Sequence, residues 1–210
     1  ILLIGHGSAD SRGSRVNLPG PDITAEEYAS MIAAFGDRPL AFVNVASASG
    51  DFHQALAGPN RIIVTATRSG LERNETIFGR YFVAAFAQDG ADVDRNGRVT
   101  IAEAFEYATR ETQRFYETAG RLKLENSRME GDEELAKLFH INGTAGAAPA
   151  EASPELRALY ARRTELEQAV DALRLRSGQM DPAQYTQELE QLLLELARVN
   201  REIAEMEGSR

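Results

Sequence analysis

The stretch that decides the fold is LAFVNVASASG, residues 40–50. Residues 40–46 form an almost uninterrupted apolar run, which is typical of a strand buried on both faces of a parallel sheet. Small residues and a glycine follow, and they indicate a loop at the end of the strand. Two further apolar runs, ILLI at residues 1–4 and RIIVTA at residues 61–66, have the same character. The first part of the chain therefore contains at least three buried strands.

Amphipathic helices are expected between and after these strands. Thr24 and Glu27 have the spacing of a capping box, which predicts a helix over residues 25–36. The apolar spacing predicts further helices over residues 77–86 and 101–119. Strands that alternate with helices predict an α/β fold with a mainly parallel sheet and helices on both faces. Ligands of such sheets bind at the carboxyl ends of the strands.

The end of the chain has a different character. Residues 121–140 show no clear pattern, and residues 141–153 are rich in Gly, Ala and Pro, as a linker would be. Residues 154–207 contain two strongly helical stretches with an apolar heptad seam, which predicts an antiparallel helical hairpin. The residues expected to pack across it are Leu166, Val170, Leu173, Leu189, Leu192 and Leu196. Two interpretations stay open: a structural hairpin docked on residues 1–140, or an arm for self-association or a protein partner.

Composition excludes several classes of protein. The 210 residues carry a formal net charge of -9, so the acidic surface would repel nucleic acid. The chain has no cysteine, which excludes disulfides, zinc–thiolate sites and a thiol nucleophile. No apolar run approaches the roughly 18 residues that a membrane span needs. Because the chain opens inside an apolar run, we expect further strands upstream of Ile1. Arginine greatly outnumbers lysine, which is typical of a GC-rich bacterial gene.

The strongest local motif is DVDRNGRVTIAE, residues 92–103, which has the ligand spacing of an EF-hand loop. Side-chain oxygens stand at positions 1, 3, 5, 9 and 12 and a backbone carbonyl at position 7, around a turn glycine at position 6. The expected Ca²⁺ ligands are Asp92, Asp94, Asn96, the carbonyl of Arg98, Thr100 and Glu103. The alternative is a solvated acidic turn that caps the next helix. A single loop without a paired partner favours a structural role for the calcium, and a calcium loop favours an exported or periplasmic location.

A second candidate site lies where two of the predicted strands end. His6 and Gly7 follow the first strand, and Ser47 follows the second. Adjacent parallel strands would bring the imidazole and the hydroxyl to the same edge of the sheet. Taken alone, a loop histidine is more often a hydrogen-bond donor than a catalyst. His53, just beyond the Ser47 loop, is interpreted as a solvated or capping residue.

The same residues resemble a known family. A strand followed by His-Gly, and a second strand that ends in Ala-Cys-x-Ser-Gly, is the pattern of caspase-like and legumain-like cysteine peptidases. Here it stands as residues 4–7 and 46–50, and residues 1–120 resemble the bacterial legumain-like branch. The resemblance implies a caspase-like fold that takes a peptide or protein segment at the carboxyl edge of the sheet. It also implies that His6 is the general base, that Ser47 holds the nucleophile position, and that Gly7 lies near the oxyanion site.

Two departures leave the activity open. Serine stands at position 47 in place of the family's cysteine, and Val45 stands where legumains have an acidic residue lining the substrate pocket. Three functions remain: a silent, calcium-stabilised binding or scaffolding module; an active cysteine endopeptidase captured as a Cys-to-Ser variant; or a serine hydrolase using Ser47 and His6. A serine needs a well-oriented base and a third group that holds the base. The candidates for that group are Asp10, Asp22 and Asp51.

Overall fold

The computed structural model describes residues 1–210 except 88, 94–97, 142–147, 149–150, 177–179 and 209–210. The chain divides into two compact units, Ile1–Ile141 and Asn142–Arg210, which are described separately. Within the described residues, no helix is long and apolar enough to cross a membrane.

The first unit is an α/β domain built on a four-stranded sheet in the order β1-β5-β6-β7. The strands are β1 (Leu2–Leu3), β5 (Leu40–Asn44), β6 (Arg61–Thr65) and β7 (Arg128–Gly131). The pairs β1–β5 and β5–β6 are parallel, as the apolar runs predict, whereas β7 is antiparallel to β6. The sequence did not predict β7, because its residues RMEG are mostly exposed and form no apolar run.

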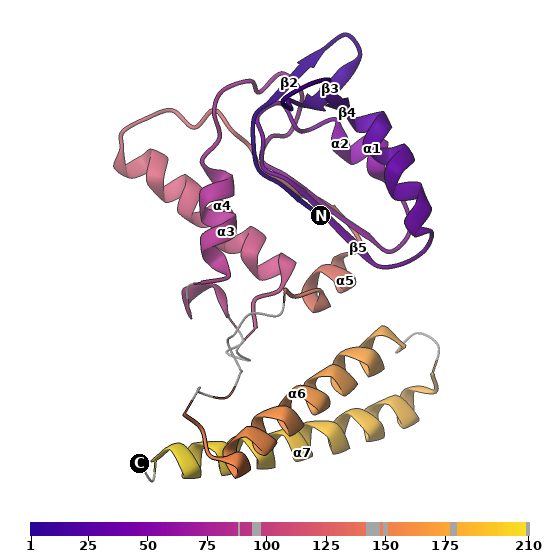
Figure 1. The fold of residues 1–210 in the computed structure, drawn as a ribbon, viewed down its shortest axis with the longest axis vertical. Helices are drawn as coiled ribbons and strands as arrows, with labels where there is room; N and C mark the ends of the chain where they lie inside the picture. The colour runs from indigo at the N-terminus through magenta and orange to yellow at the C-terminus, as the bar shows by residue number, and fades with distance from the viewer. Residues whose placement is uncertain (88, 94–97, 142–147, 149–150, 177–179, 209–210) are drawn as a thin grey trace. The chain divides into compact units, whose positions relative to one another are not determined.

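Helices cover both faces of this sheet, as predicted. Side chains alternate along β5, so Ala41 and Val43 face one apolar cluster while Leu40 and Phe42 face the other. Figure 1 shows α1 and α2 on one side of β5 and α3 and α4 on the other. The helices are α1 (Ala25–Ile32), α2 (Phe52–Leu56), α3 (Phe78–Ala85), α4 (Ile101–Thr118) and α5 (Glu133–Leu138), with 3-10 turns η1 (Ala33–Phe35) and η2 (Asp89–Ala91).

The helix start predicted from Thr24 and Glu27 is confirmed. The Thr24 hydroxyl accepts a hydrogen bond from the Glu27 amide, and the Glu27 carboxylate accepts one from the Thr24 amide at 2.7 Å. The helix then tightens into η1 and ends at Gly36, whose φ of 59° is a left-handed conformation that glycine adopts without steric cost. Thr100 and Glu103 form the same reciprocal pair at the start of α4.

A small antiparallel sheet lies between β1 and α1. It contains β2 (Gly7–Asp10), β3 (Gly13–Val16) and β4 (Ile23–Thr24). The sequence did not predict it, since residues 7–16 contain few apolar side chains. In β2 and β3, Gly7 lies opposite Val16. An ion pair between Arg15 and Asp10 also links the two strands.

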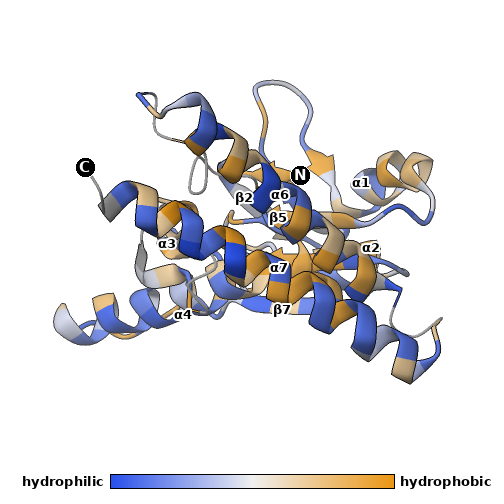
Figure 2. Ribbon diagram, turned by 90° about the horizontal axis from the view of Figure 1, so that it is seen from below, coloured by the Kyte–Doolittle hydropathy of each residue, from blue (hydrophilic) through white to orange (hydrophobic). Residues whose placement is uncertain are grey.

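The second unit consists of α6 (Pro154–Leu175) and α7 (Pro182–Gly208), which run antiparallel as the sequence predicts. The Ser153 hydroxyl caps α6 by accepting from the Leu156 amide. Figure 2 shows that hydrophobic and hydrophilic residues alternate along α7, as on an amphipathic helix. The buried core of the hairpin is Ala152, Leu156, Leu166, Val199 and Ile203, with Leu159, Tyr160, Leu192, Leu196 and Met206 packed against it.

Candidate functional site

The two strand ends that carry His6 and Ser47 are neighbours. β1 pairs in parallel with β5, and the Val45 amide donates to the Leu3 carbonyl at 3.1 Å just beyond the paired residues. The Ser47 hydroxyl donates a 2.9 Å hydrogen bond to the Gly7 carbonyl. The structure therefore brings Ser47 against the residue that follows His6.

Close backbone contact explains why residue 7 is a glycine. A Cβ built on Gly7 would lie 2.2 Å from the Ser47 carbonyl oxygen and 3.2 Å from the Ala46 Cβ. A side chain would therefore push the two strand ends apart. Gly50 has the same constraint, because its Cβ would lie 2.2 Å from the backbone of Arg68 and Ser69.

The Ser47 hydroxyl is oriented toward the backbone of Gly7. Ser47 is 9% exposed, and its proton is directed to the Gly7 carbonyl. His6 is exposed, and its carbonyl accepts from the Asn17 amide at 2.9 Å. Within the described residues, no hydrogen bond joins the His6 imidazole to Ser47. A serine nucleophile needs its proton to point at the base, so this arrangement lacks the required hydrogen bond.

The candidates for a third catalytic group are bonded elsewhere. The Asp51 carboxylate accepts from the Ser14 hydroxyl at 2.8 Å, and Asp22 accepts from the Leu18 amide at 3.2 Å. Asp10 accepts from the Arg12 amide and pairs with Arg15, and these bonds lower the pKa of its carboxyl. In the part of the chain that the structure describes, none of the three accepts a hydrogen bond from His6.

The loop after Ser47 is held by a buried network. Ala48 adopts a φ of 51°, which is unusual for a residue with a Cβ, and its amide donates to the Glu72 carbonyl at 2.8 Å. The Ser49 amide donates to the Thr67 hydroxyl at 2.8 Å, and both side chains are buried. Thr67 follows β6, so the strand end next to β5 fixes the shape of the loop.

His53 extends this network, and its prediction as a solvated or capping residue is wrong. It is only 4% exposed, and its Nε2 lies 2.9 Å from the Thr65 hydroxyl. Since that hydroxyl donates its own proton to the Thr67 carbonyl, Nε2 is the donor. The sequence position alone could not reveal the burial, because Thr65 and Glu130, which lie against the imidazole, are distant in sequence.

The other ring nitrogen of His53 faces β7. Nδ1 lies 3.3 Å from a Glu130 carboxylate oxygen but outside hydrogen-bonding geometry, and Glu130 is also paired with Arg128. Burial lowers the pKa of His53 to about 4, although the Glu130 charge acts in the opposite direction. Burial therefore determines that the pKa of His53 is lowered, because Arg128 offsets part of the Glu130 charge. His53 is therefore neutral at neutral pH.

Val45 does not line an open pocket. It is 5% exposed and belongs to the core cluster on the α3–α4 face of the sheet. Its carbonyl accepts from the Thr76 hydroxyl at 2.7 Å, and a Cβ on Gly79 would lie 2.6 Å from its side chain.

The predicted calcium loop is described at its two ends. Asp94 and Asn96 lie outside the described residues, while Asp92, Arg98, Thr100 and Glu103 lie within them. The Glu103 carboxylate accepts from the Val93 amide at 3.0 Å and from the Thr100 amide at 2.9 Å. It therefore ties the beginning of the loop to its end.

A second segment pairs with the end of this loop. Thr100 forms an antiparallel bridge with His140, and the Ile101 amide donates to the Phe139 carbonyl at 2.8 Å. The Arg98 guanidinium lies 3.1 Å from His140 Nε2. Among the described residues, no group of three or more His, Cys, Asp or Glu side chains could hold a metal.

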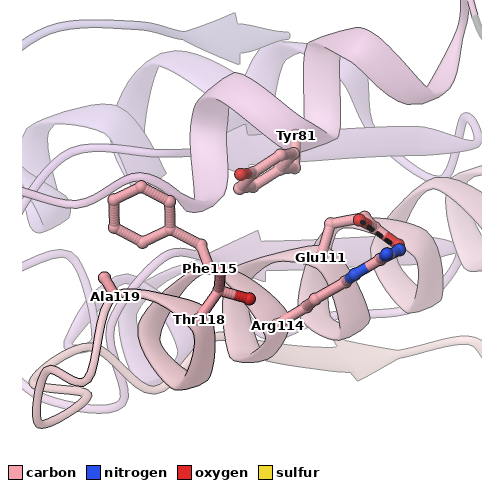
Figure 3. A pocket seen from close by; sticks show the side chains of 6 residues that line it. All are labelled: Tyr81, Glu111, Arg114, Phe115, Thr118 and Ala119. Carbon is pink, nitrogen blue, oxygen red and sulfur yellow. Dashed lines mark ion pairs between the residues drawn. The ribbon is translucent and has the colours of Figure 1, made fainter.

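Two hollows lie away from the strand ends. One, of about 330 Å³, lies between α3 and α4, where Tyr81 of α3 stands across from Phe115 and the Glu111–Arg114 ion pair of α4 (Figure 3). The other, of about 530 Å³, is lined by α4, β7 and α5 and includes Glu130. Neither contains His6, Gly7 or Ser47. The chain matches no protein-family model, no curated protein and no solved structure.

Proposed function

We propose that this chain is a catalytically silent relative of the caspase-like and legumain-like peptidases that binds a peptide or protein segment at the carboxyl edge of its sheet. The observation that carries the proposal is the hydrogen bond from the Ser47 hydroxyl to the Gly7 carbonyl. It supports a nucleophile position that serves structure in place of catalysis.

The chemistry of the two nucleophiles gives the reason. A cysteine thiol has a pKa near 8.5 and loses its proton readily to a nearby imidazole, whereas a serine hydroxyl needs an oriented base. Asp10, Asp22 and Asp51 make other hydrogen bonds, and among the described residues none of the three accepts one from His6. Serine at position 47 therefore supports a loss of peptidase activity.

Binding could persist without catalysis, because the loops are held rigidly. Ala48 keeps a left-handed conformation that costs about 1–2 kcal/mol for a residue other than glycine. Such strain is often kept at functional sites. Two exposed apolar side chains stand near the same edge: Ile4, 70% exposed, directly after β1, and Leu71, 82% exposed, in the loop after β6. They offer apolar contacts for an extended segment.

Calcium would stabilise the same domain. The position-12 residue of the loop, Glu103, already holds Val93 and Thr100 together, and Ca²⁺ is coordinated by carboxylates and carbonyls in this spacing. The bridge between Thr100 and His140 supplies a pairing segment for a loop that has no second EF-hand. These contacts favour a structural ion, far from Ser47 in sequence, that fixes the start of α4.

The test combines cleavage and binding on the full chain. We expect the wild-type protein to cleave no member of a peptide library and to resist a fluorophosphonate probe, while peptides selected from a displayed library still bind it. Leu71→Asp should weaken that binding, whereas Leu122→Asp, at an equally exposed leucine after α4, should not. Ser47→Cys tests whether the serine alone abolishes cleavage, since gained cleavage would show that the rest of the site is intact. Wild-type cleavage that disappears in His6→Ala would overturn the proposal.

A further inference from the structure

The second unit carries an apolar surface in addition to the seam that joins its two helices. Leu192, Leu196 and Val199 of α7 pack against α6, but Leu193 and Leu194 are 43% and 54% exposed. An isolated helical hairpin needs an apolar stripe on one side only. The two leucines therefore require a separate explanation.

A shallow hollow lies beside these leucines on the same helix. It has a volume of about 410 Å³ and is lined by Thr186, Leu189, Glu190, Leu193 and Leu194. The first four are spaced i, i+3, i+4 and i+7, which is the arrangement that receives a side chain from a facing helix in knobs-into-holes packing. The size and lining of the hollow are compatible with a facing helix.

The charges around Leu194 indicate which helix that is. Glu190 stands four residues before Leu194 and Arg198 four residues after it, so the three side chains lie on one face of α7. Glu190 and Arg198 are exposed, and neither forms an ion pair with any described residue. By contrast, Glu195, on another side of the helix, is paired with Arg162 of α6.

This pattern is complementary to itself in one orientation. If two copies of α7 cross antiparallel at Leu194, Glu190 of each copy lies opposite Arg198 of the other, and the leucines meet at the two-fold axis. A parallel arrangement would place like charges opposite each other, which is unfavourable. A two-fold interface requires that one patch be its own complement, and this patch is.

We infer that the chain forms an antiparallel homodimer through the face of α7 that contains Glu190, Leu193, Leu194 and Arg198. The bound partner is a second copy of this chain, because the charge order of the face fits itself. The inference is independent of what Ser47 does.

The experiment measures the mass of the full chain by sedimentation across a range of concentrations. The wild-type protein should show a monomer–dimer equilibrium, and Leu194→Gln should raise the dimer dissociation constant at least about tenfold, because an apolar contact at the axis is lost. Leu122→Gln, at an exposed leucine in the first unit, should leave the constant unchanged. Far-UV circular dichroism shows whether each variant keeps its helices.

A charge reversal tests the orientation. Glu190→Arg and Arg198→Glu should each weaken the dimer, and the double variant should restore it, since the opposite charges face each other again. A wild-type protein that remains monomeric, or a dimer that Leu194→Gln does not affect, overturns the inference. Single reversals that weaken the dimer without rescue in the double variant overturn the antiparallel pairing.

Discussion

The phenol of Tyr116 donates a 2.9 Å hydrogen bond to the carboxylate of Glu125. Glu125 is only 2% exposed, and its oxygens also accept from the amides of Ile77 and Phe78 at the start of α3. A buried carboxylate at a helix N-terminus is stabilised by these amides and by the helix dipole. The loop before β7 is thereby attached to the helix that follows the candidate site.

We expect Tyr116→Phe to destabilise the first unit by about 1.5–3 kcal/mol at neutral pH, because Glu125 loses a hydrogen bond to a charged group. Burial, together with Glu125, raises the pKa of Tyr116 from 10.0 to about 12. The stabilising contribution is therefore complete below pH 10 and is lost as the pH rises toward 12. Chemical denaturation of wild type and variant at neutral and alkaline pH checks both effects. The control is Tyr81→Phe, whose phenol makes no hydrogen bond to a described residue.

Acid should destabilise the first unit through His53. Burial lowers the pKa of this residue from 6.5 to about 4, so its contribution is complete above pH 6.5 and is lost as the pH falls toward 4. Melting temperatures across this range should fall less steeply for His53→Gln, which keeps a donor but cannot ionise. Gln54→His places a histidine on the exposed side of α2 and should leave the fall in melting temperature at acid pH unchanged. Equal acid sensitivity of wild type and His53→Gln would assign the effect to another group.

Calcium should raise the melting temperature of the wild-type chain over its value in chelator. At about 100-fold excess over the dissociation constant, an ion that binds the native state alone adds roughly 2.7 kcal/mol. Glu103→Gln should abolish this response, because an amide cannot bind calcium in a bidentate manner, while still capping α4. Calorimetry in millimolar Ca²⁺ and in chelator is the measurement. Identical melting curves of the wild-type protein in calcium and in chelator would show that the loop does not bind calcium.

A cavity in the hairpin seam should destabilise the second unit. Leu166 is 3% exposed in the core of the second unit, so Leu166→Ala should cost about 2–5 kcal/mol. Hydrogen exchange of the amides of α6 and α7 reports this locally, and faster exchange is the expected result. Gln168→Ala, at an exposed position of the same helix, is the control. Unchanged exchange in Leu166→Ala would mean that the seam is not buried.

Local signals in the sequence were sufficient for the parallel strands and the helix starts. The apolar run of β5 and the capping box of Thr24 and Glu27 depend on neighbouring residues, so they can be read without knowledge of the fold. β7 could not be found in this way, because only its pairing with β6 makes RMEG a strand.

The candidate site was also predictable only where it depends on neighbouring residues. The sequence indicated that His6 and Ser47 follow strands, but the Ser47–Gly7 bond depends on how closely the two loops approach. The roles of His53 and Glu125 depend on Glu130 and Ile77, which are far away in the chain and carry no pattern that links them. The spacing of residues 92–103 predicts a calcium loop, and this stays a prediction.

The antiparallel pairing of β7 with β6 has a consequence for the order of folding. Thr65 pairs with Arg128, and both α3 and α4 lie between these two residues in the chain. Closing so long a loop costs entropy that short-range contacts do not, and such contacts form late. We therefore expect the parallel strands and the Ser47 loop to form before β7 joins the sheet and brings Glu130 against His53.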